Sequence, residues 1–128
     1  MKFIAEDDSL TIKLEGSEII LGLKKKLLLP RKSIADLRWT AEFNDPDMVL
    51  RVVGAAIPRL IYAGHFRDLT SNQNLFLYVR KPTGLTIKGG FGGENVLIIT
   101  LKNFNYGQVI INCEPLIGKQ LVGWWRRG

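Results

Sequence analysis

Short runs of alternating apolar and polar residues, closed by glycine, proline or asparagine, constrain this chain more than any other feature. Leu10, Ile12 and Leu14 alternate with polar neighbours, which is the period of a half-buried β-strand. A Gly-Ser pair at positions 16–17 follows between two glutamates and predicts a hairpin turn into a return strand over Ile19–Leu23. The chain is therefore expected to consist mainly of short strands.

The return strand cannot continue straight, because Lys25 would then point into the core between Leu23 and Leu27. A buried lysine without a partner is very costly. A turn or bulge is therefore expected at Lys24–Lys26. Pro30 cannot donate a hydrogen bond to a neighbouring strand, so it confines the short leucine strand before it to the edge or the end of a sheet.

Further segments along the chain have the composition or the alternation of strands. They are Ile34–Trp39, Leu50–Val53, Ile57–Ala63, Leu75–Val79, Leu85–Ile87, Val96–Leu101 and Val109–Cys113. Turn-forming residues gather between some of them and predict turns or loops at Phe43–Asp47, Gly89–Gly93 and Asn103–Gly107. Strands of this length and spacing are typical of small barrels and sandwiches.

The period changes after Cys113. Leu116, Ile117, Leu121 and Trp124 recur at helical spacing, and a proline precedes them at the first helical position. The sequence thus predicts a C-terminal helix over about 114–126. The predicted fold is mainly β, a single domain over 1–128 with a small, seven-stranded, bent antiparallel barrel or sandwich capped by one C-terminal α-helix.

Three stretches resemble a known family. They are LRVVGAAIPRLIYAGHFR (50–67), FLYVRKP (76–82) and VIINCEP (109–115). An Ala-Gly-x-Phe step, a strand ending in valine and arginine, and a valine-rich strand leading into a helix that begins with proline are similar to prokaryotic pleckstrin-homology-like domains. The basic run Lys24–Lys26 is also similar, and the resemblance covers roughly residues 10–125. It implies a binding or assembly scaffold rather than a reaction.

Positive charge is concentrated in one part of the chain. The net charge is +6, and residues 19–39 alone hold six basic residues and one acid. Such asymmetry favours an anionic partner. The candidate anion- or phosphate-binding residues are Lys24, Lys25, Lys26, Arg31 and Lys32. An anionic membrane surface attracts each such residue by about 1 kcal/mol.

Catalytic and metal sites find little support in the residues. His65 and Asp68 are three positions apart, which places them on opposite faces of a strand. One histidine and one cysteine cannot supply a zinc site of ordinary spacing. The glycines at 89–93 are not followed by the lysine and hydroxyl residue of a phosphate loop. We therefore expect no catalytic residues, no metal and no cofactor.

Two functions follow as hypotheses. The first is a non-enzymatic module for contact with a protein partner or for self-association. The alternative is a peripheral binder of an anionic membrane or of phosphate head groups through the basic cluster between Lys24 and Lys32. Nucleic-acid binding and a small-molecule substrate are not expected. Because Cys113 is the single cysteine and no signal peptide is evident, the expected compartment is the cytoplasm, with the membrane's inner face as the place where lipid would be bound.

The stretch around the lone histidine is interpreted as scaffold. Ala63 and Gly64 are expected at a bend where two backbones approach closely. Phe66 should point into the core, so its neighbour His65 should point to the opposite face and towards solvent.

Overall fold

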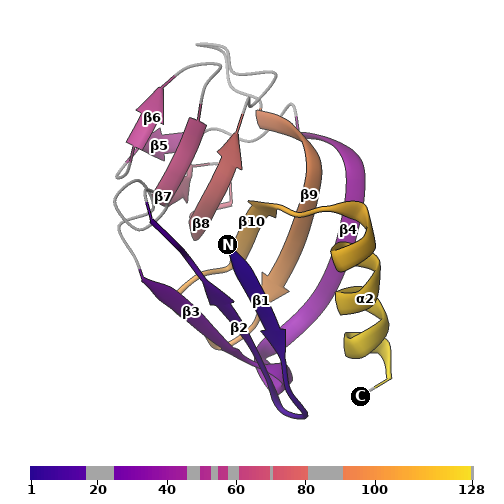
Figure 1. Ribbon diagram of the computed structural model, residues 1–128. Helices are drawn as coiled ribbons and strands as arrows, with labels where there is room; N and C mark the ends of the chain where they lie inside the picture. Colours follow the sequence, from indigo (N-terminus) through magenta and orange to yellow (C-terminus); the bar gives the residue numbers. More distant parts are fainter. Residues whose placement is uncertain are drawn as a thin grey trace.

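The computed structural model describes residues 1–16, 25–45, 50–52, 55–57, 61–69, 71–80 and 91–127. Ten strands, one short 3₁₀ helix and one α-helix lie in these ranges. In chain order they are β1 (Lys2–Ala5), β2 (Ser9–Lys13), β3 (Lys26–Pro30), η1 (Arg31–Ser33), β4 (Ile34–Asp45), β5 (Leu50–Val52), β6 (Ala55–Ile57), β7 (Ile61–Asp68), β8 (Gln73–Arg80), β9 (Phe91–Leu101), β10 (Gln108–Asn112) and α2 (Pro115–Arg126). The fold is mainly β with one C-terminal helix, as the sequence predicts (Figure 1).

The strands form two sheets. The small sheet has the order β1-β2-β3 and is antiparallel throughout. The large sheet has the order β4-β9-β10-β8-β7-β5, and β6 also pairs with β7. In Figure 1 the small sheet lies across the lower part of the large one, and α2 lies along β4.

Of the predicted barrel or sandwich, the barrel is wrong, because the two sheets do not close into one. Among the described residues no ladder joins a strand of one sheet to a strand of the other. The large sheet is also not purely antiparallel. After the tight turn that follows β9, the chain returns as β10 between β9 and β8, and β10 runs parallel to β8. The position of β10 depends on its pairing with β8, which is distant in the sequence, and the turn residues do not predict that pairing.

The first core lies between the two sheets. It is built from alternating residues of the small sheet, from one face of the large sheet and from α2. Its buried members include Leu10, Ile12, Leu27, Leu29, Leu37, Phe76, Leu97, Ile99, Val109, Ile111 and Leu121. The period-2 pattern over residues 10–14 therefore has the expected cause, since Leu10 and Ile12 point into this core while Lys13 is exposed.

A second core lies on the opposite face of the large sheet. It consists of Phe66, Leu75, Leu77, Val79, Phe91, Val96, Ile98 and Ile110. The central strands β8 and β9 thus carry buried residues on both faces, which explains why their sequences are continuous apolar runs rather than alternating ones.

The chain bends where the sequence predicts a turn or bulge at Lys24–Lys26. Lys26 pairs regularly with Lys13, and Leu14 donates its N–H to Lys25 O at 3.0 Å. The bend lies at Lys25, just before β3, and leaves the Lys25 side chain exposed at the sheet end rather than in the core. Strand β2 pairs with β1 on one side and with β3 on the other. The predicted return strand 19–23, Lys24 and the predicted strand 85–87 lie outside the described residues. Pro30 ends the edge strand β3, as predicted.

Two predicted loops are in fact strand. Residues 43–45 belong to the long β4 and pair with residues 91–93 at the start of β9. Gly93 lies in a strand rather than in the predicted turn, and its lack of a side chain allows close packing, because a Cβ on it would lie 2.7 Å from Val79 Cγ1. A glycine in a strand permits such close approach. The rest of these two segments lies outside the described residues.

The C-terminal helix is confirmed. Pro115 occupies its first turn and Arg126 its last turn. Gly118 and Leu121 are buried on the side that packs against the large sheet. The helix thereby covers β4, one edge strand of the large sheet.

Candidate functional site

The basic residues predicted to form one anion site fall at the two ends of β3. Lys24 lies outside the described residues. Lys25 and Lys26 are exposed where β3 begins, whereas Arg31 and Lys32 follow its far end in η1. A five-residue strand separates its two ends by about 17 Å. The predicted cluster therefore divides into two basic surfaces that no small ligand can reach together.

Arg31 is engaged in the fold. Its backbone N–H donates to Asp8 O at 2.8 Å, and its Nη1 donates to Asp7 O at 2.6 Å. Its Nη2 donates to the carbonyl oxygen of Trp124, and its guanidinium carbon lies 4.4 Å from the centre of the Trp124 ring. Arg31 thus ties the β1–β2 hairpin to the C-terminal end of α2 through both terminal nitrogens, while its buried Nε has no hydrogen-bond partner among the described residues.

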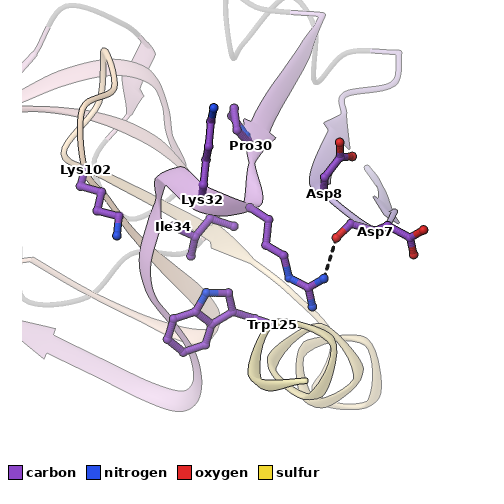
Figure 2. Close-up of a pocket in the computed structure, with 8 residues that line it drawn as sticks. Asp7, Asp8, Pro30, Lys32, Ile34, Lys102 and Trp125 are labelled. Atoms are coloured by element: carbon purple, nitrogen blue, oxygen red, sulfur yellow. Dashed lines mark hydrogen bonds between the residues drawn. The ribbon is translucent and has the colours of Figure 1, made fainter. Parts of the chain in front are cut away.

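A hollow of about 530 Å³ opens beside Arg31, and we call it the cationic pocket (Figure 2). Its lining comes from the β1–β2 hairpin, the end of β3, η1, the start of β4, the β9–β10 turn and α2. The lining residues are Asp7, Asp8, Pro30, Arg31, Lys32, Ile34, Lys102 and Trp125. Of the four predicted cations that the structure describes, Arg31 and Lys32 line it and Lys25 and Lys26 do not.

The charge of the cationic pocket suits a small anion weakly. Lys32 and Lys102 are exposed, and the backbone N–H of Lys102 donates to Ser33 O at 2.8 Å, which fixes the β9–β10 turn beside η1. Trp125 supplies an indole wall. In Figure 2 the carboxylates of Asp7 and Asp8 point away from Trp125, but they still reduce the positive potential that an arriving anion meets.

The sequence interpretation missed Lys102 and Trp125 as pocket residues. Lys102 follows β9 and is about 70 positions from Lys32, so adjacency in the chain carries no signal for their meeting. They are brought together because the β9–β10 turn lies beside η1.

A second hollow separates the small sheet from α2, and we call it the β1–α2 groove. It has a volume of about 550 Å³ and is lined by Met1, Lys2, Phe3, Ile4, Ala5, Ile117, Gln120, Leu121, Trp124 and Arg127. All four residues of β1 form one wall, and one side of α2 forms the other. Met1, Phe3 and Ile117 also line a further hollow of about 430 Å³, so the groove continues past the N-terminal end of α2. The lining of the β1–α2 groove itself is mostly apolar, with Gln120, Lys2 and Arg127 as its polar side chains. The further hollow is more polar and includes Glu94 and Glu114.

Strand β1 presents a free backbone edge to this groove. Glu6 donates its N–H to Ser9 O at 2.9 Å, which makes this pair a hydrogen-bonded one in the β1–β2 hairpin. In an antiparallel ladder hydrogen-bonded and non-hydrogen-bonded pairs alternate. The register pairs Ile4 with Thr11, so Ile4 bonds inward, whereas the N–H and C=O groups of Phe3 and Ala5 point outward. Within the described chain β1 has no second strand neighbour.

One end of the groove is closed by a side-chain contact. The indole Nε1 of Trp124 donates to Glu6 O at 2.7 Å, beside the Arg31 contacts described above. The hairpin and the last turn of α2 are therefore held together at this end. This contact sets the distance between strand and helix at that end of the groove.

Comparison with known proteins adds no family to this geometry. No family model, curated protein or solved structure matches the chain. A helix long and apolar enough to cross a bilayer does not occur within the described residues.

His65 does not point into solvent as predicted. It lies on the face opposite Phe66, but that face belongs to the core between the sheets. Its Nδ1 is 2.6 Å from the hydroxyl of Tyr106, and its ring meets Phe76 edge to face with centroids 6.0 Å apart. Burial raises the pKa of the Tyr106 phenol above its ordinary value of 10.0. The bend is as expected, since Gly64 has a φ of +112° and Ala63 is fully buried.

The other polar residues of that strand are engaged separately. Arg67 Nε donates to Asn72 Oδ1 at 3.1 Å, while Asp68 accepts from Ser71 Oγ at 2.9 Å. These contacts stabilise the turn between β7 and β8. In the described ranges no three histidine, cysteine, aspartate or glutamate side chains lie close enough to hold a metal ion.

Cys113 is buried where β10 leads into α2, with 5% of its surface exposed. Burial, and after it the neighbouring Glu114 carboxylate, raise the pKa of this thiol to about 11 from its ordinary value of 9.0. The thiolate is the reactive form. The residue therefore behaves as a small apolar core residue whose carbonyl accepts a hydrogen bond from Trp39 Nε1 at 2.8 Å.

We predict that Cys113 in the folded protein reacts with iodoacetamide at pH 8 about a hundredfold more slowly than a free thiol, because its thiolate fraction falls with the raised pKa. Guanidinium unfolding should restore the ordinary rate. Since the unfolded chain ionises first, the free energy of unfolding should fall as the pH rises from 9.0 towards 11. Mass-spectrometric rates in both states measure the effect, and equal rates would contradict it.

Proposed function

We propose that the chain is a non-enzymatic protein-interaction module that takes an extended segment of a partner protein along the free edge of β1. The β1–α2 groove is the observation that carries this proposal. An extended peptide adds to an exposed sheet edge through main-chain hydrogen bonds, and pockets beside the edge select alternate side chains. The outward groups of Phe3 and Ala5 supply such bonds.

The chemistry of the lining defines the segment. Phe3, Ile117 and Leu121 offer apolar surface to side chains that point from the bound segment towards the helix. Lys2 and Arg127 are the charged residues of the lining, and both are exposed. Charge complementarity therefore favours a segment that alternates apolar residues with aspartate or glutamate. A groove of about 550 Å³ can take roughly four residues of an extended chain.

The resemblance to pleckstrin-homology-like domains supports the same class of role, since it implies a binding or assembly scaffold. A mainly β fold with a C-terminal helix agrees with that class. The parallel pairing of β8 with β10 departs from the expected antiparallel barrel, so the resemblance supports a role and not a strand-by-strand correspondence. No reaction is proposed.

We predict that Ala5→Pro weakens the binding of such a segment about fivefold, whereas Ala5→Val leaves it nearly unchanged. Proline removes the outward N–H of Ala5 without touching the β1–β2 ladder, and one lost hydrogen bond costs about 1 kcal/mol. Valine at the same exposed position keeps the N–H and favours a strand. Peptides selected from a displayed random library against the native protein provide the ligands, and fluorescence anisotropy measures the dissociation constants.

Three results would contradict the proposal. The first is recovery of no peptide that binds, and the second is equal binding by the proline and valine variants. The third is a dimer that forms with rising concentration, detected by light scattering and lost in Ala5→Pro. That result would assign the edge to a second copy of this chain instead of a partner protein.

A further inference from the structure

Three lysines lie side by side on the outer face of the small sheet. Lys2 pairs with Lys13 across β1 and β2, and Lys13 pairs with Lys26 across β2 and β3. All three side chains are exposed, and none forms an ion pair within the described residues. We call these three residues the lysine row.

The lysine row is unfavourable for the isolated fold. Side chains of directly opposed residues on one sheet face are about 5 Å apart, and like charges at that distance destabilise the pairing. The inward neighbours Ile12 and Leu27 are already 98% or more buried, so the lysines contribute nothing to the core. A surface that gathers three ammonium groups in register is suited to an anionic partner.

The next row on the same face is apolar and exposed. Ile4 pairs with Thr11, and Thr11 pairs with Leu28. Ile4 is 44% and Leu28 55% exposed, and both belong to the small group of large apolar side chains exposed in this way. The outer face thus combines a cationic row with an aliphatic row about 7 Å away.

Acids border this face and limit its charge, among them the exposed Asp7 and Asp8 of the loop between β1 and β2. Glu6 is exposed in the row beyond Ile4, at the hairpin end of the sheet. Glu15 follows β2 beyond the lysine row, and its Oε1 lies 3.7 Å from the Met1 ammonium. None of these acids interrupts the three lysines, so the positive charge remains at one end of the face and the aliphatic residues in its middle.

We propose that this outer face binds the anionic surface of a lipid bilayer, with the lysine row at the level of the lipid phosphates and Ile4 and Leu28 in the interface. Membrane-surface attachment combines buried apolar area with attraction of lysines to anionic lipid. The rows contain no aromatic residue, whereas a binder of single-stranded nucleic acid uses aromatic stacking platforms. This surface takes only Lys26 from the predicted cluster between Lys24 and Lys32. It shares Lys2 and Ile4 with the β1–α2 groove, whereas Lys13, Lys26 and Leu28 lie outside that groove.

The decisive comparison is between two double variants of equal charge. Lys13→Ala/Lys26→Ala should weaken sedimentation with phosphatidylserine-containing vesicles about thirtyfold, because each lysine contributes about fivefold in the binding constant. Lys32→Ala/Lys102→Ala removes the same charge from the cationic pocket and should change binding by less than about threefold. Pure phosphatidylcholine vesicles should bind far less protein, and added salt should weaken the binding.

A second measurement reports on the apolar row and on folding. Leu28→Cys can be labelled with an environment-sensitive dye while the buried Cys113 stays unmodified. Its emission should shift to the blue when anionic vesicles are added. The Lys13→Ala/Lys26→Ala variant should unfold at the native temperature or above it, because repulsion between neighbouring lysines is removed. It should also bind groove peptides like the native protein.

The proposal is overturned by any of four results. These are equal binding to neutral and anionic vesicles, equal losses in the two double variants, an unshifted emission at position 28, and binding to oligonucleotides without binding to vesicles. Because Lys13 and Lys26 do not line the groove, failure here leaves the peptide results untouched, and failure of peptide binding leaves the vesicle results untouched.

Discussion

Phe66→Ala is expected to lower the free energy of unfolding by about 3–5 kcal/mol, as truncations of large buried aromatic residues do. The ring is only 2% exposed and packs in the second core, on the face of the large sheet that points away from the small sheet. Its cross-strand partner on β8 is Leu75, which is fully buried. Removing the ring therefore leaves a cavity among residues held rigidly by the sheet. Urea denaturation followed by circular dichroism measures the loss.

His65→Ala is the matched control, since it lies next to Phe66 in the same strand and points to the other face. The sequence alone predicts almost no cost for a surface histidine. The contact with Tyr106 changes this expectation to about 1 kcal/mol, the usual contribution of one hydrogen bond. A loss of less than about 1 kcal/mol for Phe66→Ala, or a larger loss for His65→Ala than for Phe66→Ala, would contradict the assignment of the two faces.

The sequence predicts the local structure of this chain better than its topology. The alternation over residues 10–14 and the helical spacing from 116 to 124 each reflect which side of one strand or helix faces the core. A short stretch of sequence is therefore enough to predict these two elements. The insertion of β10 between β8 and β9 contains no such signal. It depends on pairing between residues more than thirty positions apart, such as Phe76 and Val109.

The same reasoning explains the candidate sites. The sequence groups Lys24–Lys26 with Arg31 and Lys32 because they are close in the chain, but β3 holds the two groups apart. The register instead places Lys26 beside Lys13 and Lys2, which are 13 and 24 positions away. Strand β1 itself was not predicted, since four residues with one polar interruption do not distinguish a strand from an irregular end. Without β1 neither the groove nor the lysine row can be foreseen.

Arg31 shows why charge in a sequence does not measure charge available to a ligand. Its position in a basic cluster suggested anion binding, yet its donors are directed at the carbonyl oxygens of Asp7 and Trp124. The residue joins the hairpin that follows β1 to the end of α2. The β1–α2 groove thus depends on Arg31 through the position of its hydrogen bonds rather than through its net charge.

Gly118→Ala is expected to destabilise the protein by about 1–3 kcal/mol, although alanine is the better helix former by about 1 kcal/mol. A Cβ at this position would lie 2.3 Å from Cδ1 of Trp39, which is shorter than any real contact. The indole cannot turn aside easily, because its Nε1 donates to Cys113 O at 2.8 Å and its ring packs against the core between the sheets. The helix must therefore move outward.

Gly123→Ala on the same helix is the control with the opposite expected sign. The nearest atom to a Cβ there is the flexible Nη1 of Arg127 at 3.5 Å, an ordinary contact, so the gain in helix propensity should raise stability by about 0.5–1 kcal/mol. Thermal unfolding of both variants measures the difference. If both substitutions stabilise the protein, the close contact between α2 and Trp39 is not present in solution.

A substitution at the contact should restore what Gly118→Ala loses. Trp39→Leu removes the ring that the new methyl group meets, so the cost of Gly118→Ala should be smaller by about 1–3 kcal/mol in that background than in the native one. The same outward movement of α2 widens the β1–α2 groove, whose far wall contains Ile117 and Leu121. Gly118→Ala should therefore also weaken the binding of peptides in the β1–α2 groove. Vesicle binding should be unchanged, because the lysine row lies on the outer face of the small sheet, opposite its core. Loss of both activities together would show that the two surfaces are not independent.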